Sequence, residues 1–217
     1  MSKEGIPTLV GLMVLALLMY WGSRLFDAKL LVVFTGILVF AALFSVYFFR
    51  DPQRMPPQDP MAIVSPCDGK VIGIDRVREN EFVQGEATRI AIFMSVFNVH
   101  VNYVPFRGTV EYMRFFRGKY LRADLPDAST HNVHILTGLA TPYGKLLFKQ
   151  STGMIARRLV NNLRQGQKVE TGEKFGIIKF GSRMEVYLPA CAQPTIQIGE
   201  SVRACESVIA MINEEEK

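Results

Sequence analysis

A glycine–serine pair late in the chain has the residue types for a reaction of the backbone on itself. Gly181 and Ser182 lie between two stretches, 177–180 and 184–188, that are typical of short β-strands. A serine hydroxyl can act as a nucleophile, and a glycine before it tolerates a strained backbone and close approach to its carbonyl. Such a pair is usually only part of a tight turn, so the other residues of the chain decide whether it is structural or catalytic.

The Gly-Ser bond is also the one that self-processing pyruvoyl enzymes cut. In those enzymes the serine hydroxyl attacks the preceding carbonyl, the resulting ester eliminates, and the serine becomes an N-terminal pyruvoyl group. Ser182 is therefore a candidate nucleophile, and Gly181 supplies the candidate carbonyl.

Two further residues could move or stabilise charge. His100 lies in the alternating segment 99–104, and histidine titrates near neutral pH, which suits proton transfer. A histidine in an apolar strand is more often a satisfied core residue. Asp68 precedes Gly69 between apolar runs, a pattern that predicts a hairpin-type turn for backbone reasons alone.

The histidines and cysteines do not predict a metal site. His131 and His134 are three residues apart and could face the same way on a helix, but no carboxylate pair accompanies them. The three cysteines are odd in number and lack the spacing of metal ligands, which suits a reducing compartment without a disulfide framework. They are Cys67, Cys191 and Cys205.

The first 49 residues predict a membrane anchor. No charged side chain occurs from Gly5 to Ser23 or from Leu30 to Phe49, and a helix needs about 20 apolar residues to cross a bilayer. We expect a transmembrane helical hairpin over 1–49. A cleaved signal peptide and a hairpin lying in the interface are the alternatives.

Charge gives a weak orientation. Lys3, Arg50 and Arg54 flank one side of the hairpin and Arg24 and Lys29 the other, which favours a cytoplasmic domain on the inner cell membrane by one charge. The formal net charge of +5 is modest. This positive charge would attract a membrane-tethered domain to anionic lipid headgroups. The sequence lacks a dense basic stripe, so it does not predict nucleic-acid binding.

The rest of the chain predicts a β-rich α+β fold. Residues 50–60 form a proline-rich linker, and 61–217 contain mostly strand and turn patterns, apart from a helical pattern over 151–163. Two similar turns, near 166–173 and 198–202, resemble those of lipoyl- and biotinyl-carrier domains. We therefore expect a mostly antiparallel domain with a carrier-like barrel-sandwich portion, in which Ser182 takes the place of the carrier lysine at the tip of a hairpin.

Several separated segments together resemble phosphatidylserine decarboxylase in its short, membrane-anchored prokaryotic form. They fall in the family's order along about 150 residues, and the ordered set is far more specific than any single piece. The matching segments are 48–52 (FFRDP), 65–71 (SPCDGKV), 93–102 (FMSVFNVHVN), 156–158 (ARR) and 179–183 (KFGSR).

The resemblance implies a reaction and a maturation step. Cleavage at Gly181–Ser182 would give a β chain, 1–181, and an α chain, 182–217, which stay together as a heterodimer and could oligomerise further. The pyruvoyl group from Ser182 would form a Schiff base with the headgroup amine of phosphatidylserine in the bilayer. Loss of carbon dioxide would then give phosphatidylethanolamine, as a step of phospholipid biosynthesis.

The resemblance also implies roles for individual residues. His100 would transfer protons, Asp68 would orient a base or stabilise charge, and Asn132, Arg157 and Arg158 would contact the substrate's carboxylate or phosphate. Longer members of the family carry a second histidine three residues after the first, where this chain has Tyr103. Their proposed Asp-His-Ser triad is therefore in doubt here, and strain with backbone polarisation is the alternative means of activating Ser182.

Two other functions are compatible with these residues. A related enzyme could act on archaetidylserine, which differs in the lipid and not in the headgroup chemistry. A non-catalytic, membrane-tethered scaffold with a carrier-like barrel would instead remain one chain with an intact serine.

Overall fold

The computed structural model describes residues 1–125, 127–154, 158–178 and 181–213. The chain divides into two compact units, Met1–Pro52 and Gln53–Lys217, and the boundary lies within the proline-rich segment.

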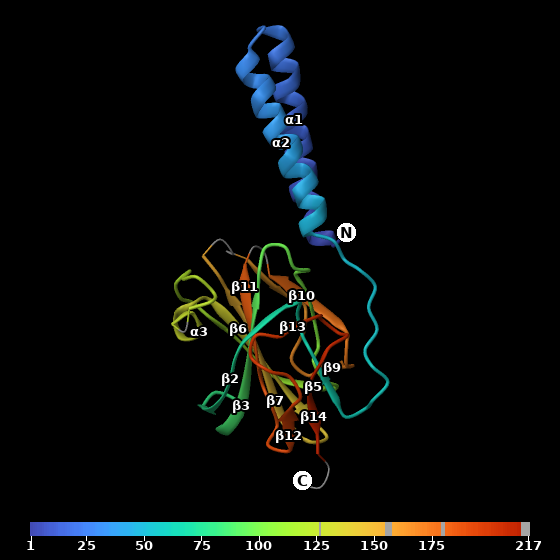
Figure 1. Ribbon diagram of the computed structural model, residues 1–217, viewed down its shortest axis with the longest axis vertical. Coiled ribbons are helices and arrows are strands. Elements are labelled where there is room, and N and C mark those ends of the chain that lie inside the picture. The colour runs from blue at the N-terminus through green and yellow to red at the C-terminus, as the bar shows by residue number, and fades with distance from the viewer. Residues whose placement is uncertain (126, 155–157, 179–180, 214–217) are drawn as a thin grey trace. The chain divides into compact units, whose positions relative to one another are not determined.

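The first unit consists of two long apolar helices after a short 3-10 turn, η1 (Lys3–Gly5). Helices α1 (Ile6–Leu25) and α2 (Lys29–Phe48) pack side by side (Figure 1). Both are long and apolar enough to cross a membrane, and most of their large side chains are exposed to solvent. Exposed apolar surface of this extent calls for an apolar environment, which supports the prediction of membrane association.

The second unit is β-rich, as the sequence predicts. Its one described helix is α3 (Ala128–His131), and its described strands are β1 (Ala62–Val64), β2 (Gly69–Glu79), β3 (Gly85–Met94), β4 (Val101–Tyr103), β5 (Gly108–Phe116), β6 (His134–Thr141), β7 (Gly144–Thr152), β8 (Leu159–Asn161), β9 (Lys168–Val169), β10 (Lys174–Ile178), β11 (Ser182–Tyr187), β12 (Ala192–Pro194), β13 (Ser201–Val202) and β14 (Val208–Ile212).

These strands form three antiparallel sheets, and the largest apolar cluster contains residues from all three. The largest sheet has the order β13-β2-β3-β11-β7-β6-β5-β9, and the smaller ones have the orders β1-β14-β12 and β4-β10-β8. Strand β11 lies between β3 and β7 in the large sheet (Figure 1), and all six of its residues are buried. A strand buried on both faces fixes its side chains more firmly than an edge strand does.

Two local predictions are wrong. In the described part of 151–163, Ser151 and Thr152 end β7 while 159–161 form β8. Pairing of β8 with β10 outweighs the helical spacing of Leu159 and Leu163. The turn at Asp68 does not join a hairpin, since β1 pairs with β14 and β2 pairs with β3 and β13.

The pairing around Gly181 also differs from the predicted hairpin. Strand β10 pairs with β4 and β8, whereas β11 pairs with β3 and β7. The segment between β10 and β11 therefore passes from one sheet to another. Residues 179 and 180 of this segment lie outside the described residues.

Cys67, Cys191 and Cys205 are free and buried. Burial raises the pKa of the Cys67 thiol well above its ordinary value, so this thiol stays protonated and unreactive.

Candidate active site

Ser182 is the first residue of the central strand β11 and is fully buried. It is paired with Met94 of β3 on one side and with Thr152 of β7 on the other. Its Oγ donates a hydrogen bond to the Met94 sulfur at 3.2 Å. The serine is thus held from both neighbouring strands while the residue before it lies outside the sheet.

Gly181 has the left-handed conformation that favours glycine, with a φ of +64°. A Cβ added there would meet nothing within 4 Å, so the backbone conformation and not lack of space requires glycine. At Gly153 the reverse holds, because a Cβ there would collide with the carbonyl oxygen of Gly181. The two glycines together let the backbone before Ser182 take an unusual conformation next to the end of β7.

His100 is buried beside the segment that leads to Gly181. Its backbone carbonyl accepts a hydrogen bond from Ile178, the last residue of β10, at 3.3 Å. Its Nδ1 lies 2.9 Å from the carbonyl oxygen of Asn98. A carbonyl can only accept, so Nδ1 of the neutral ring carries the proton and Nε2 is the basic nitrogen.

Asp68 joins three parts of the second unit. Its carboxylate forms a salt bridge with Arg54, and it accepts hydrogen bonds from the backbone N–H groups of Val99 (3.3 Å) and Ala204 (2.9 Å). Burial alone would lower the pKa of Arg54, but hydrogen bonding and attraction to Asp68 outweigh it and raise the pKa. Through Val99, the carboxylate holds the residue that precedes His100.

Asn132 is fully buried and bonded within the protein. Its side chain bonds the backbone N–H and C=O of Leu121 at 2.8 and 2.9 Å and the C=O of Thr152 at 2.7 Å. It therefore ties the loop at Leu121 to the strand partner of Ser182. Arg158 is exposed, and Arg157 lies outside the described residues.

The two remaining histidines do not share a helix. His131 ends α3, and His134 begins β6, where its ring stacks on Phe116 with ring centres 4.6 Å apart. In the part of the chain that the structure describes, no three His, Cys, Asp or Glu side chains gather as a metal site.

A cavity of about 380 Å³ opens beside Gly181. Its lining comes from the ends of β3 and β7 and from the loop between β5 and α3, and Ser182 itself is not part of it. The lining residues are Phe93, Ser95, Val96, Arg122, Ala123, Asp124, Gly153, Met154 and Gly181. The cavity thus gives access to the glycine side of the Gly181–Ser182 bond.

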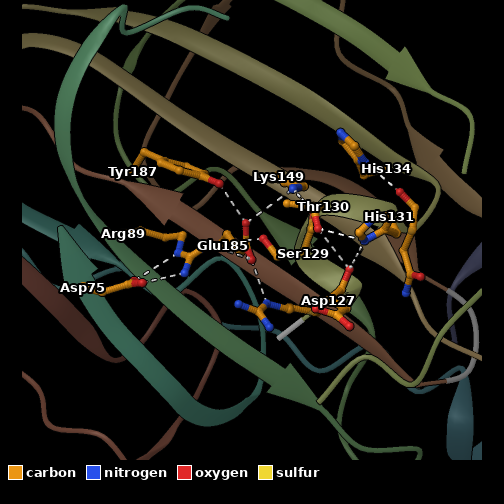
Figure 2. A network of polar contacts seen from close by, with 12 residues as sticks. Asp75, Arg89, Asp127, Ser129, Thr130, His131, His134, Lys149, Glu185 and Tyr187 are labelled. Atoms are coloured by element: carbon orange, nitrogen blue, oxygen red, sulfur yellow. Dashed lines mark hydrogen bonds and ion pairs between the residues drawn. The ribbon is translucent and has the colours of Figure 1, made fainter. Parts of the chain in front are cut away.

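A buried charge network, which the sequence analysis missed, lies on the other face of β11 (Figure 2). Glu185 is fully buried, and Nε of Arg183 lies 2.7 Å from its carboxylate. The Lys149 Nζ lies 3.6 Å from the same group, and the Tyr187 hydroxyl donates to it at 2.8 Å. Arg89 lies 3.9 Å from the carboxylate and is itself held by Asp75 and Ser129.

The charges of this network favour an ionised Glu185. Burial alone would raise the pKa of Glu185, but Lys149, Arg183 and the other neighbours outweigh it and lower the pKa to about 2. Burial lowers the pKa of Lys149, and Glu185 opposes that effect. The sequence does contain a pattern that indicates this network. Arg183, Glu185 and Tyr187 alternate with apolar residues, so one face of the strand is polar and the other is apolar.

Comparison with known proteins gives one consistent result. The family model for phosphatidylserine decarboxylase matches residues 41–210. A phosphatidylserine decarboxylase proenzyme of Desulfotalea psychrophila is 38% identical over 212 residues, covering 97% of this chain and 96% of that protein. The corresponding proenzyme of Pelobacter propionicus is 41% identical over 210 residues, covering 96% and 95%.

A third relative matches a shorter region more closely. The phosphatidylserine decarboxylase proenzyme of Salinibacter ruber is 46% identical over 172 residues, covering 78% of this chain and 76% of that protein. The family match includes Ser182 and nearly the whole second unit. This chain belongs to the phosphatidylserine decarboxylase family.

Proposed function

We propose that this chain is a proenzyme that cuts itself between Gly181 and Ser182 and then decarboxylates phosphatidylserine to phosphatidylethanolamine. The observation that carries the proposal is the geometry at this bond. A glycine in a left-handed conformation precedes a buried serine at the start of the central strand, and a cavity opens on the glycine side. The chain's relatives are named as proenzymes of this activity.

In maturation, Oγ of Ser182 attacks the carbonyl carbon of Gly181 and the peptide nitrogen leaves, so an ester replaces the amide. Elimination releases Gly181 as a carboxylate and leaves a double bond in residue 182. Tautomerisation and hydrolysis with one water then give the pyruvoyl group and ammonia. The left-handed backbone at Gly181 and the close approach of Gly153 hold this carbonyl next to the strand that carries the nucleophile.

The residues around position 182 fit a pyruvoyl group. Pairing with Met94 and Thr152 would hold a new N-terminus at the start of β11, and the cavity borders the adjacent Gly181. The pyruvoyl carbonyl supplies the electron sink that loss of carbon dioxide from an amino acid requires.

His100 is the proposed proton carrier, through its basic Nε2. Asp68 supports it indirectly, because it holds Val99 and so fixes the backbone beside the histidine. Activation of Ser182 by backbone strain is the alternative to activation by His100, and Tyr103 occupies the position of the family's second histidine. Asn132 acts in this scheme by positioning Thr152, while Arg158 and Arg157 remain proposed contacts for the substrate's anionic groups.

The finer features of the assembly are also proposals. The α chain, 182–217, would carry β11 to β14 and stay bound to the β chain through their strand pairing. The hairpin over 1–49 would anchor the pair in the inner cell membrane with the second unit in the cytoplasm. The carrier-like portion of the fold would lie in the part of the second unit that contains the two similar turns.

The test is a denaturing gel of the purified chain with mass analysis of the fragments, beside Ser182→Ala. We expect the wild type to split after Gly181 into a large chain and a small chain with a blocked N-terminus, while the variant stays whole. Incubation with phosphatidylserine then gives phosphatidylethanolamine for the wild type alone. A folded wild type that remains one chain would contradict the proposal and support the non-catalytic scaffold, and activity on archaetidylserine alone would support the related enzyme.

A further inference from the structure

Exposed apolar and basic side chains lie on the loops that line the cavity beside Gly181. Phe97, Met154 and Leu125 have 65%, 59% and 43% of their surface exposed. Lys119 and Arg122 are also exposed. These five residues are called the rim below.

Strand pairing brings the loops of the rim together. The loop with Phe97 follows β3, the loop with Lys119, Arg122 and Leu125 follows β5, and Met154 follows β7. Met94 at the end of β3 and Thr152 at the end of β7 are both paired with Ser182. The carbonyl of Leu125 also accepts a hydrogen bond from Arg183 at 3.4 Å, so this loop is held beside the same end of β11.

The turns at the other end of the large sheet differ from the rim. Its turns are 80–84, between β2 and β3, and 142–143, between β6 and β7. Neither turn contributes one of the exposed large apolar side chains of the described residues. Isolated exposed apolar residues are ordinary on protein surfaces, but their concentration around one cavity mouth indicates a contact surface.

The charges of the rim suit an anionic partner. The loop 117–125 carries Arg117, Lys119 and Arg122 against Asp124, and Asp124 pairs with Arg122 at 2.8 Å. A net positive charge remains beside the apolar side chains. Apolar residues interspersed with Lys and Arg are typical of surfaces that enter the boundary of an anionic bilayer.

The chain also enters the second unit near this end. Arg54 binds Asp68, and Asp68 binds Val99 in the same loop as Phe97. The N-terminal end of the second unit is therefore fixed beside one of the loops of the rim. A membrane tether raises the effective concentration of the tethered domain at the bilayer.

We infer that the rim docks on the surface of a bilayer that contains anionic phospholipid, so that a lipid headgroup reaches the cavity while its acyl chains stay in the membrane. This inference rests on the proposed function. Ser182 is buried, so the headgroup has to enter the protein. Phe97 and Leu125 would insert among the lipids, and Lys119 would contact their phosphates.

The first test compares two forms of one substrate, with the full chain reconstituted in vesicles. The variant is Phe97→Ser with Leu125→Ser, since neither side chain lines the cavity. We expect turnover of phosphatidylserine diluted in the vesicle bilayer to fall about tenfold, the equivalent of about 1.4 kcal/mol of lost contact. Turnover of a short-chain phosphatidylserine dissolved as monomers should stay within about twofold, because an isolated lipid does not need docking. Equal losses for both forms, or no loss for either, would overturn the inference.

The second test does not depend on activity. The chain has one tryptophan, Trp21, so Trp21→Phe combined with Phe97→Trp places a single fluorophore on the rim. Brominated phosphatidylserine in the vesicles should quench it. Trp21→Phe with Asn80→Trp, in an exposed turn at the other end of the sheet, should not be quenched and is the control.

The two tests separate the possible failures. If wild-type protein decarboxylates neither form of the substrate but the rim tryptophan is quenched, the proposed function fails and the docking surface stands. If the substrate is decarboxylated and the rim is quenched no more than the control, docking is wrong. If lipid does not change the fluorescence of the rim tryptophan and crosslinking through the rim detects dimers, the rim contacts a second copy of the chain instead of the bilayer.

Discussion

Arg183 and Glu185 point to the same buried face of β11, with Nε of the arginine 2.7 Å from Oε1 of the glutamate. Ser182, the residue before Arg183, points to the opposite face, where it contacts Met94. Cleavage after Gly181 would leave this ion pair on the C-terminal fragment. Lys149 and Arg89, which approach the same carboxylate, would remain on the N-terminal fragment. The network therefore connects the two products of the proposed cut.

Removal of the Glu185 charge should destabilise the protein strongly. Glu185→Gln leaves Arg183 and Lys149 buried without their carboxylate, and loss of one member of a buried ion pair costs about 3–5 kcal/mol. Thermal unfolding followed by near-UV circular dichroism measures the loss. The control is Asp75→Asn, which removes a half-exposed partner of Arg89 and should cost about 1 kcal/mol or less. Similar effects of both changes would contradict a central role for Glu185.

Substitution of Gly153 should slow self-cleavage. In Gly153→Ala the new methyl group collides with the carbonyl oxygen of Gly181 and displaces the group that Ser182 attacks. Even a small displacement of a reacting group slows an oriented reaction by about 10- to 100-fold. The rate at which the single chain disappears on a denaturing gel gives the effect.

The matched control for Gly153→Ala is Gly166→Ala. Gly166 has a φ of +85°, and a Cβ there meets nothing within 4 Å. Alanine at this position should therefore cost about 1–2 kcal/mol of stability through backbone strain, without a change in the cleavage rate. Equal cleavage by Gly153→Ala and the wild type would show that the position of this carbonyl is not limiting.

Asp68→Asn should lower both stability and cleavage. The amide keeps the shape of the side chain but leaves Arg54 without its counter-charge, which costs about 3 kcal/mol for a buried pair. It also weakens the bond to the backbone of Val99, beside His100. Asp59→Asn, in an exposed turn, is the control. Cleavage at the wild-type rate by a folded Asp68→Asn chain would remove Asp68 from the proposed machinery.

His134 should make stability depend on pH. Burial lowers the pKa of His134, and the positive charge of Lys149 adds to the effect, while Glu185, Glu81 and the Asn132 carbonyl oppose it. The unfolded chain then binds a proton that the folded chain does not. The free energy of unfolding should therefore fall as the pH drops through about 6.5, the ordinary value for histidine.

The comparison for this pH effect is His134→Phe, which keeps an aromatic ring against Phe116. Denaturant unfolding of both proteins between pH 7.5 and 5.5 measures the difference. The variant should lose less stability than the wild type over this range. Parallel curves for the two proteins would mean that another group is responsible.

Much of the architecture could be predicted because it depends on local composition. Two uncharged stretches predicted α1 and α2, and the alternating segment 99–104 predicted a strand where β4 lies. The leucines of 159–163 were misleading, because spacing by four residues is also possible in a short strand followed by a loop, and pairing with β10 determines the outcome. Long-range pairing of this kind is not encoded in a local pattern.

The site was predicted in part for the same reason. The residue types alone suggest a nucleophile at Ser182, a reactive carbonyl at Gly181 and a proton carrier at His100. The structure places His100 next to the segment that leads to the glycine. The contacts of Asp68 with Arg54 and Ala204 could not be predicted, because the partners are 14 and 136 residues away. The network around Glu185 depends on the register of β3, β11 and β7, which the sequence does not reveal.

The passage of the chain from one sheet to another at Gly181 has a consequence for the mature protein. Because β10 and β11 pair with different strands, a break between them separates no two strands that are paired with each other. The two ends produced by the break are free to separate and relax the left-handed backbone at Gly181, while every described strand keeps its neighbours. In the proposed reaction residue 182 also loses its nitrogen as ammonia, so the peptide bond cannot re-form. Release of the strained conformation at Gly181 therefore accompanies a cut that is permanent.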